Sequence, residues 1–151
     1  PYLARQKMLR GIVATDFFQG LSLLHTYQKR KDDISAGKTG KQIAGVSAKR
    51  EAVLGLPLAA YQQWKDPLKE GFWKVAKFLR KESFFSTHDL SYRTQLVPLA
   101  AILALLGDRW LEPRIYDKLA RWYWCGVLGK SFVDVVCDDI PEDDLDEVDT
   151  L

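Results

Sequence analysis

Residues 96–106 read Leu-Val-Pro-Leu-Ala-Ala-Ile-Leu-Ala-Leu-Leu, and this run gives the strongest indication of the fold class. Apolar side chains fall on most sides of a helix built from these residues, and such a helix is normally packed among neighbouring helices. The run is 11 residues long, too short to cross a bilayer. Gly107 suits the position just past a helix end, and Pro98 must either lie near the first turn or kink the helix, because proline lacks a backbone N–H. We therefore expect a central helix over residues 96–106.

The N-terminal part of the chain predicts a long amphipathic helix followed by a loop. Apolar residues recur at three- and four-residue steps from Leu9 toward Arg30, either as one continuous helix or as one that restarts at Thr15. The next stretch has little apolar content and three glycines, which is typical of an exposed loop. The sequence therefore predicts an exposed, basic, mobile loop over residues 29–48.

Residues 47–64 carry signals for two short helices. Ser47 can cap a helix that ends near Gly55. Pro57 can open a second helix that runs through Trp64, because proline is tolerated in a first turn. We expect two separate short helices here.

Two dipeptides mark the starts of longer amphipathic helices. Asp66 and Pro67 form a strong signal, because Asp accepts a free backbone N–H and Pro needs none in the first turn. Glu112 and Pro113 start the last helix, which should end around residues 126–129. The expected core faces of these two helices are Leu68, Phe72, Val75, Ala76 and Leu79, and then Ile115, Leu119 and Trp122. The sequence thus predicts a single compact all-α domain of about six helices over residues 1–130, followed by an acidic, disordered C-terminal tail over residues 131–151.

Charge is divided unevenly along the chain. Residues 1–130 hold all 22 Lys and Arg and 11 of the 20 acidic residues, a net charge of +11, whereas residues 131–151 hold the other nine acids and no base. A cationic body with an anionic tail indicates either a polyanionic partner or a tail that folds back on its own body. An ordinary solvated surface with a disordered tail explains the same numbers.

The chain offers no motif for catalysis or metal binding. Gly37-Lys38-Thr39 is similar to the end of a phosphate-binding P-loop, but Asp32 stands where that motif needs a glycine, and no buried strand precedes it. His25 and His88 are far apart, with no clustered cysteines, so they do not predict a zinc site or a His-Asn-His nuclease centre. We expect no catalytic residue, no metal ligand and no cofactor.

Cysteines and tryptophans give further indications. Cys125 and Cys137 do not form a disulfide framework, so a reducing cytoplasmic location is expected. Trp73 and Trp122 fall at or beside helical core positions. Trp110 lies in the loop after the central helix, and it is the tryptophan that we expect to be exposed.

Several strings in the helical region resemble a known protein family. The most specific are Leu96-Val97-Pro98-Leu99-Ala100 and Arg121-Trp122-Tyr123-Trp124-Cys125-Gly126. Further matches are Phe18, residues 23–27, Lys49-Arg50, Leu54, Leu58, Tyr61, Trp64, Asp66-Pro67 and Phe78-Leu79. Over residues 15–129 the chain resembles the helical region of large bacterial proteins of the GmrSD type.

GmrSD-type proteins carry an N-terminal ParB/sulfiredoxin-like domain, and many also carry a C-terminal His-Asn-His nuclease domain. The family includes restriction systems that cleave modified phage DNA with a nucleotide and a divalent metal. Neither the Asp-Gly-Gln-Gln-Arg motif of the first domain nor the nuclease histidines of the second occur here. The resemblance therefore implies a connecting helical domain of a phage-defence protein, or a fragment of a longer protein, without a catalytic role. After Gly129 the chain departs from the family pattern, so residues 130–151 inherit no expectation from it.

The cations best suited to contact DNA phosphates lie in and around the predicted loop. They are Lys29, Arg30, Lys31, Lys38, Lys41, Lys49 and Arg50. Cations on a flexible segment can follow a polyanion without reading its sequence. We expect the DNA backbone and other domains of a longer parent protein as partners, and no membrane, while the sequence leaves a homo-oligomer open. The rival hypothesis is a structural protein–protein interaction module with no nucleic-acid role, whose partner surface would be an apolar patch near Trp110 or on the final helix.

Overall fold

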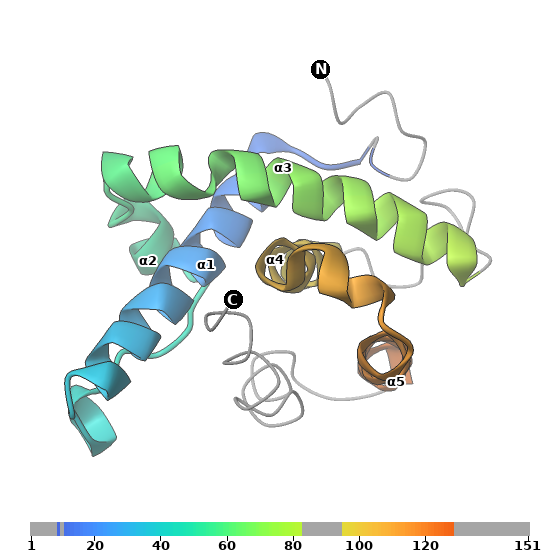
Figure 1. Cartoon of the computed structure of the whole chain (residues 1–151). Coiled ribbons are helices and arrows are strands. Elements are labelled where there is room, and N and C mark those ends of the chain that lie inside the picture. The colour runs from blue at the N-terminus through green and yellow to red at the C-terminus, as the bar shows by residue number, and fades with distance from the viewer. Residues whose placement is uncertain (1–8, 10, 83–94, 129–151) are drawn as a thin grey trace.

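The helix predicted from residues 96–106 lies among other helices in an all-α structure. The computed structural model describes residues 9, 11–82 and 95–128, with side chains as far as Trp124 (Figure 1). The predicted acidic tail and His88 lie outside the described residues. Helices are the only regular elements in the described part, so the predicted fold class is confirmed. In chain order the elements are α1 (Ala14–Ser35), the 3-10 helix η3 (Gly40–Gln42), α2 (Arg50–Leu54), α3 (Leu58–Lys81), α4 (Leu96–Leu106), the 3-10 helix η6 (Gly107–Leu111) and α5 (Pro113–Leu128).

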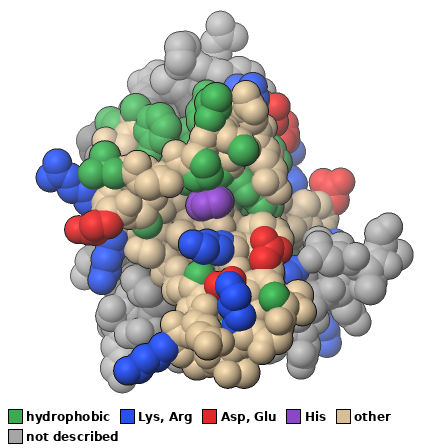
Figure 2. Space-filling view, turned by 90° about the vertical axis from the view of Figure 1, so that its left-hand side faces the viewer, with side chains coloured by type: hydrophobic (Ala, Val, Ile, Leu, Met, Phe, Trp, Pro, Cys, Tyr) green, Lys and Arg blue, Asp and Glu red, His purple; other side chains and the backbone are tan. Residues whose placement is uncertain are grey.

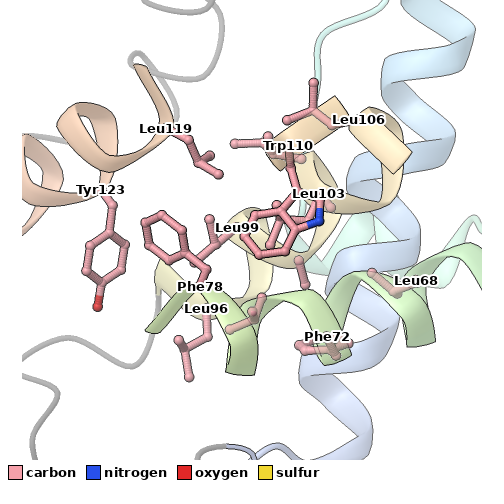
Figure 3. Close-up of a cluster of buried hydrophobic side chains, with 14 of the residues drawn as sticks. Leu68, Phe72, Phe78, Leu96, Leu99, Leu103, Leu106, Trp110, Leu119 and Tyr123 are labelled. Carbon is pink, nitrogen blue, oxygen red and sulfur yellow. The ribbon is translucent and has the colours of Figure 1, made fainter. Parts of the chain in front are cut away.

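α4 lies at the centre of the fold, as its sequence predicts. Its residues are buried except for Ala104 and Leu105, which are half-buried. In Figure 1, α3 runs across the top of the molecule over α4, and α1 lies to one side and α5 to the other. Figure 3 shows the α4 leucines grouped with side chains from α3, η6 and α5. Each fully buried leucine or phenylalanine here contributes about 1.5–3 kcal/mol through the hydrophobic effect, so this cluster supplies most of the driving force for folding.

Two glycines allow the backbone of this core to form. Gly71 of α3 lies so close to α4 that a Cβ on it would overlap the carbonyl oxygen of Ala100. Gly107 ends α4 with a φ of 58°, in the left-handed region that favours glycine. Pro98 lies in the first turn of α4. The predicted end of this helix is therefore confirmed, and of the two alternatives for its proline the first-turn position is the one observed.

One continuous helix replaces two predicted ones in the middle of the chain. α3 runs through Asp66 and Pro67 without ending, so the predicted helix start at Asp66 is wrong. A proline inside a helix removes one backbone N–H and leaves the carbonyl of Gln63 without its helical partner. Gln63 is an exposed residue, whereas Ala60 and Leu68, on the two sides of the proline, are both buried. Burial on both sides thus outweighs the local stop signal, and the described part has five α-helices where about six were predicted.

α1 extends further than its apolar pattern indicates. It continues to Ser35, so the prediction of a loop is wrong for residues 29–35. The side chain of Gln28 donates a hydrogen bond to Asp32 one turn later, at 2.9 Å, and such pairs stabilise a helix surface. The last turns of α1 are stabilised by polar contacts of this kind and have no apolar stripe. A prediction based on the spacing of apolar residues therefore does not detect them.

The other helix ends follow the sequence signals within a residue or two. α1 begins at Ala14, beside the predicted restart at Thr15. α2 ends at Leu54, immediately before Gly55. α5 has the predicted start and end, and its predicted core face is buried at all three positions: Ile115, Leu119 and Trp122.

Candidate nucleic-acid interface

Residues 36–49 form a loop that folds back along the outer side of α1. The Ser22 hydroxyl donates to the carbonyl oxygen of Ser47 at 2.8 Å, and the Ser47 N–H donates to the Thr26 hydroxyl oxygen at 3.0 Å. Ser22 is fully buried at this contact. Ser47 is thus used to hold the segment on α1, and it does not cap α2, which begins at Arg50. The predicted loop is therefore present over residues 36–49, and polar side chains of α1 supply it with hydrogen-bond partners.

Asp33 holds the middle of the same segment. Its Oδ2 accepts the Ala44 N–H at 2.9 Å, and its Oδ1 accepts the Lys38 ammonium at 2.6 Å. The pKa of Asp33 lies below its ordinary value, chiefly because of the hydrogen bond from Lys38 and next because of the bond from Ala44. The Lys38 N–H also donates to the Asp33 carbonyl oxygen at 3.0 Å. Lys38 therefore serves as the counter-ion of Asp33 within the chain.

Four of the seven predicted DNA-binding residues form no ion pair within the described part of the chain: Lys29, Lys41, Lys49 and Arg50. All four are exposed, and we call them the basic strip. Lys29 belongs to α1 and Lys41 to η3, while Lys49 and Arg50 stand at the start of α2. Residues 36–49 return along α1 from Asp33 to Ser22, so the strip extends from the C-terminal end of this helix to its middle. Figure 2 faces this end of the molecule and shows Lys and Arg side chains distributed over its surface.

The other three predicted residues are engaged in contacts within the chain. Lys38 pairs with Asp33. A guanidinium nitrogen of Arg30 donates to the carbonyl oxygen of Ala44 at 3.5 Å. The ammonium of Lys31 lies 5.9 Å from the centre of the Tyr27 ring, within the range of a cation–π interaction. The structure thus separates the cations that help to hold this surface from those that face solvent on it.

The basic strip suits contacts to phosphate groups more than contacts to bases. Ammonium and guanidinium groups bind phosphate oxygens of any sequence, whereas base recognition needs side chains placed in a groove. The backbone that carries Lys41 and Lys49 is already ordered by the hydrogen bonds of Ser47 and Ala44. The arrangement can therefore bind a polyanion without first ordering a loop.

Trp110 is buried, so the prediction that it is exposed is wrong. Only 3% of its surface is accessible, and its ring centre lies 6.3 Å from that of Tyr116. The ammonium of Lys81 lies 5.9 Å from the Trp110 ring centre. Figure 3 shows the ring within the apolar cluster. The 3-10 turn of η6 directs Trp110 back into the core and leaves the next residue, Leu111, at the surface.

Sequence reasoning missed a polar contact that joins α3 to α5. The two carboxylate oxygens of Glu82 accept hydrogen bonds from the Tyr116 hydroxyl at 2.6 Å and from the Trp124 indole N–H at 2.9 Å. Burial and this bond to Glu82 raise the pKa of Tyr116. The partners are far apart in the chain, so no local sequence signal could have paired them.

A group of exposed apolar side chains at the junction of α2 and α3 was also missed. Leu54 is 74% exposed and Leu58 is 71% exposed, and Tyr61 follows one turn later on α3 at 38%. We call these three residues the apolar ledge. The sequence does show leucines beside Gly55 and Pro57. The prediction used Gly55 only as the end of one helix and Pro57 only as the start of the next, and it made no use of the leucines.

Within residues 9, 11–82 and 95–128, no group of three or more His, Cys, Asp or Glu is placed to hold a metal ion. None of the helices described is both long and apolar enough to span a bilayer. The Cys125 side chain and all of Cys137 lie outside the described part. No family model, no curated protein and no solved structure matches this chain.

Proposed function

We propose that this chain is a non-catalytic helical domain of a GmrSD-type, modification-dependent restriction protein, in which it binds the DNA backbone or positions the nuclease domains. The basic strip is the observation that supports a DNA contact, because its four cations are exposed and form no ion pair in the described part of the chain. The resemblance of residues 15–129 to the helical region of that family supports the place in a restriction protein. In this proposal the chemistry of cleavage belongs to other domains.

The ordered backbone of the strip favours binding. Fixing a flexible residue costs about 1–2 kcal/mol, and residues 36–49 are already held on α1 before any ligand binds. Each cation that neutralises a phosphate releases counterions, so that the logarithm of affinity falls by about 0.9 per contact for each tenfold rise in salt. Four contacts give a slope of roughly −3.6. Lys38 adds little to this slope while Asp33 holds its ammonium at 2.6 Å.

The test is fluorescence anisotropy of a labelled DNA duplex titrated with the full chain, from low to physiological salt. Lys41→Glu with Lys49→Glu should weaken binding by roughly tenfold at low salt and make the salt slope shallower by about 1.8. The matched control is Lys69→Glu with Lys77→Glu, which makes the same change in net charge at exposed positions of α3. We expect the control to retain most of the affinity, because these residues lie outside the strip.

Two results would contradict the proposal. Equal losses in the two double variants would show that net charge, and not the strip, governs binding. No binding at low salt, either by the full chain or by the chain with the nine acids of residues 131–151 replaced by Asn and Gln, would remove the nucleic-acid role and favour the rival function, a structural protein–protein interaction module. The apolar ledge supports that rival, since large exposed apolar side chains are common at protein interfaces. Self-association in light scattering without DNA binding would then identify it.

A further inference from the structure

The junction of α2 and α3 places apolar and basic side chains next to each other. α2 is only five residues long, with Arg50 at its start and Leu54 at its end. Lys49 precedes it directly, and Leu58 begins α3 after a three-residue turn. Figure 2 shows hydrophobic side chains gathered in the upper part of this face and Lys and Arg side chains below and beside them. This surface therefore offers an apolar contact and an electrostatic contact within a few residues of each other.

Nothing in the described part of the chain covers this surface. Leu54 and Leu58 are the two most exposed large hydrophobic residues there, and Lys49 and Arg50 are exposed without an ion pair. A ligand that satisfies both halves must combine carboxylates with apolar side chains. A nucleic-acid backbone supplies the anions but no aliphatic side chain, so the ledge has no partner in a DNA complex of the strip.

We propose that residues 131–151 of this same chain dock on the apolar ledge and on Lys49 and Arg50. These residues contain nine acids and no base, with apolar side chains between the acids. The apolar members are Phe132, Val133, Val135, Val136, Ile140, Leu145, Val148 and Leu151. Their composition thus complements both halves of the surface. The proposal goes beyond DNA binding and does not rest on it, since an acidic and apolar segment suits this surface whether or not the strip contacts a nucleic acid.

The segment is long enough to reach the junction from the end of α5. Twenty extended residues span roughly 66 Å. The longest helix, α3, has 24 residues and is therefore about 36 Å long. A tethered segment also has an effective concentration in the millimolar range, so weak contacts are sufficient for docking. Charge attraction between exposed groups is screened by salt, and the docked population should fall as salt rises.

The experiment uses the full chain with a nitroxide spin label on Cys137, after Cys125→Ala leaves one cysteine. Paramagnetic broadening is read from the NMR signals of residues 49–61 and, for comparison, of Leu111, an exposed leucine in η6. We expect signals at Lys49, Arg50 and the ledge to lose intensity selectively at low salt and to recover at high salt. Leu54→Ser with Leu58→Ser should reduce the loss at Lys49 and Arg50 severalfold, whereas the control Leu111→Ser should leave it unchanged.

Three outcomes would overturn the proposal. Equal broadening at Leu111 and at the ledge would show a segment without a preferred site. Broadening at Lys49 that is the same with and without the Leu54→Ser and Leu58→Ser substitutions would show that the contact is electrostatic alone. Spin-labelled chains without isotope enrichment can also be mixed with isotope-enriched chains that carry no spin label. Broadening that appears only in this mixture would assign the contact to residues 131–151 of a second copy.

A second measurement covers the case in which Cys125→Ala disturbs the fold. The nine acids of residues 131–151 are replaced by Asn and Gln in an otherwise unchanged full chain, and methyl chemical shifts are compared with those of the parent. Docking predicts shift changes concentrated at Leu54 and Leu58. An unchanged ledge would contradict docking, and this readout involves no DNA, so its failure is separate from a failure of the proposed function.

Discussion

The two sides of α1 are held by different forces. Its inner side packs against α3 and α4 through fully buried leucines, Leu21 and Leu24. Its outer side holds residues 36–49 through Ser22, Thr26 and Asp33, with hydrogen bonds of 2.8–3.0 Å. The inner side contributes stability that depends on apolar area and shape, whereas the outer side fixes the position of a short segment through a few polar groups. The core therefore decides whether the chain folds, and the outer side decides how the basic strip is presented.

The comparison predicts its largest effect for truncation of a core aromatic residue. Phe72 is fully buried and its ring centre lies 6.2 Å from that of Phe17, so Phe72→Ala should lower the free energy of unfolding by about 3–5 kcal/mol. Urea denaturation followed by circular dichroism measures this loss. Phe18→Ala is the control, because Phe18 lies on α1 and is 42% exposed. Similar losses for the two variants would contradict the assignment of stability to the inner side.

Two glycines, one in the core between α3 and α4 and one in residues 36–49, give a smaller contrast in stability. Gly71→Ala should destabilise the fold by about 1–3 kcal/mol, because its Cβ would overlap the backbone of Ala100 and force α3 and α4 apart. Gly45→Ala should be neutral or stabilising by up to about 1 kcal/mol, because no atom lies within contact of a Cβ there and alanine restricts the unfolded chain. Thermal unfolding of the two variants distinguishes them. A stable Gly71→Ala protein would show that α3 and α4 can separate at little cost.

The smallest effect on global stability is expected at Asp33, where the change should be local. Asp33→Ala should expose the Ala44 amide to faster hydrogen exchange and leave the unfolding midpoint nearly unchanged, because it releases only the middle of residues 36–49 while Ser47 stays bonded to α1. Asp33→Asn keeps a hydrogen-bond acceptor for Ala44 but gives up the ion pair with Lys38. The protection of the Ala44 amide from exchange in Asp33→Asn should therefore lie between its protection in the parent and in Asp33→Ala.

The pH dependence of this contact has a definite sign. The pKa of Asp33 is below its ordinary value of 3.8 in the folded protein, so its stabilising effect is present above 3.8 and is lost as the pH falls through the lowered pKa. The difference in Ala44 protection between the parent and Asp33→Asn should be full at neutral pH and disappear in that acidic range. A difference that grows on acidification would mean that the carboxylate does not hold the segment.

Sequence patterns predicted the core better than the outer side of α1 for a physical reason. The α4 run and the face of Ile115, Leu119 and Trp122 were readable because burial selects apolar residues at helical spacing. The contacts of Ser47 and Asp33 join polar residues across a fold-back, and no periodicity records them. The sequence could likewise list seven candidate cations, but only the structure shows that Lys38 is already paired.

Local signals also failed where tertiary packing opposed them. Asp66 and Pro67 make a good helix start by themselves, yet the buried residues on both sides keep α3 continuous. Trp110 follows a helix-ending glycine and was therefore expected at the surface, but a single 3-10 turn returns it to the core. In both cases the deciding energy comes from residues that a short sequence window does not contain.

The central place of α4 has a consequence for the order in which the protein can fold during synthesis. The chain leaves the ribosome N-terminus first, and α1 and α3 are complete before any part of α4 exists. Until residue 106 has emerged, the faces that contain Leu24, Phe72 and Val75 lack the helix that covers them. A nascent chain that pauses between α3 and α4 therefore presents these apolar faces to chaperones and to other nascent chains. This exposure ends when the eleven residues of α4 have been synthesised, although α1, α3 and α5 are all longer helices.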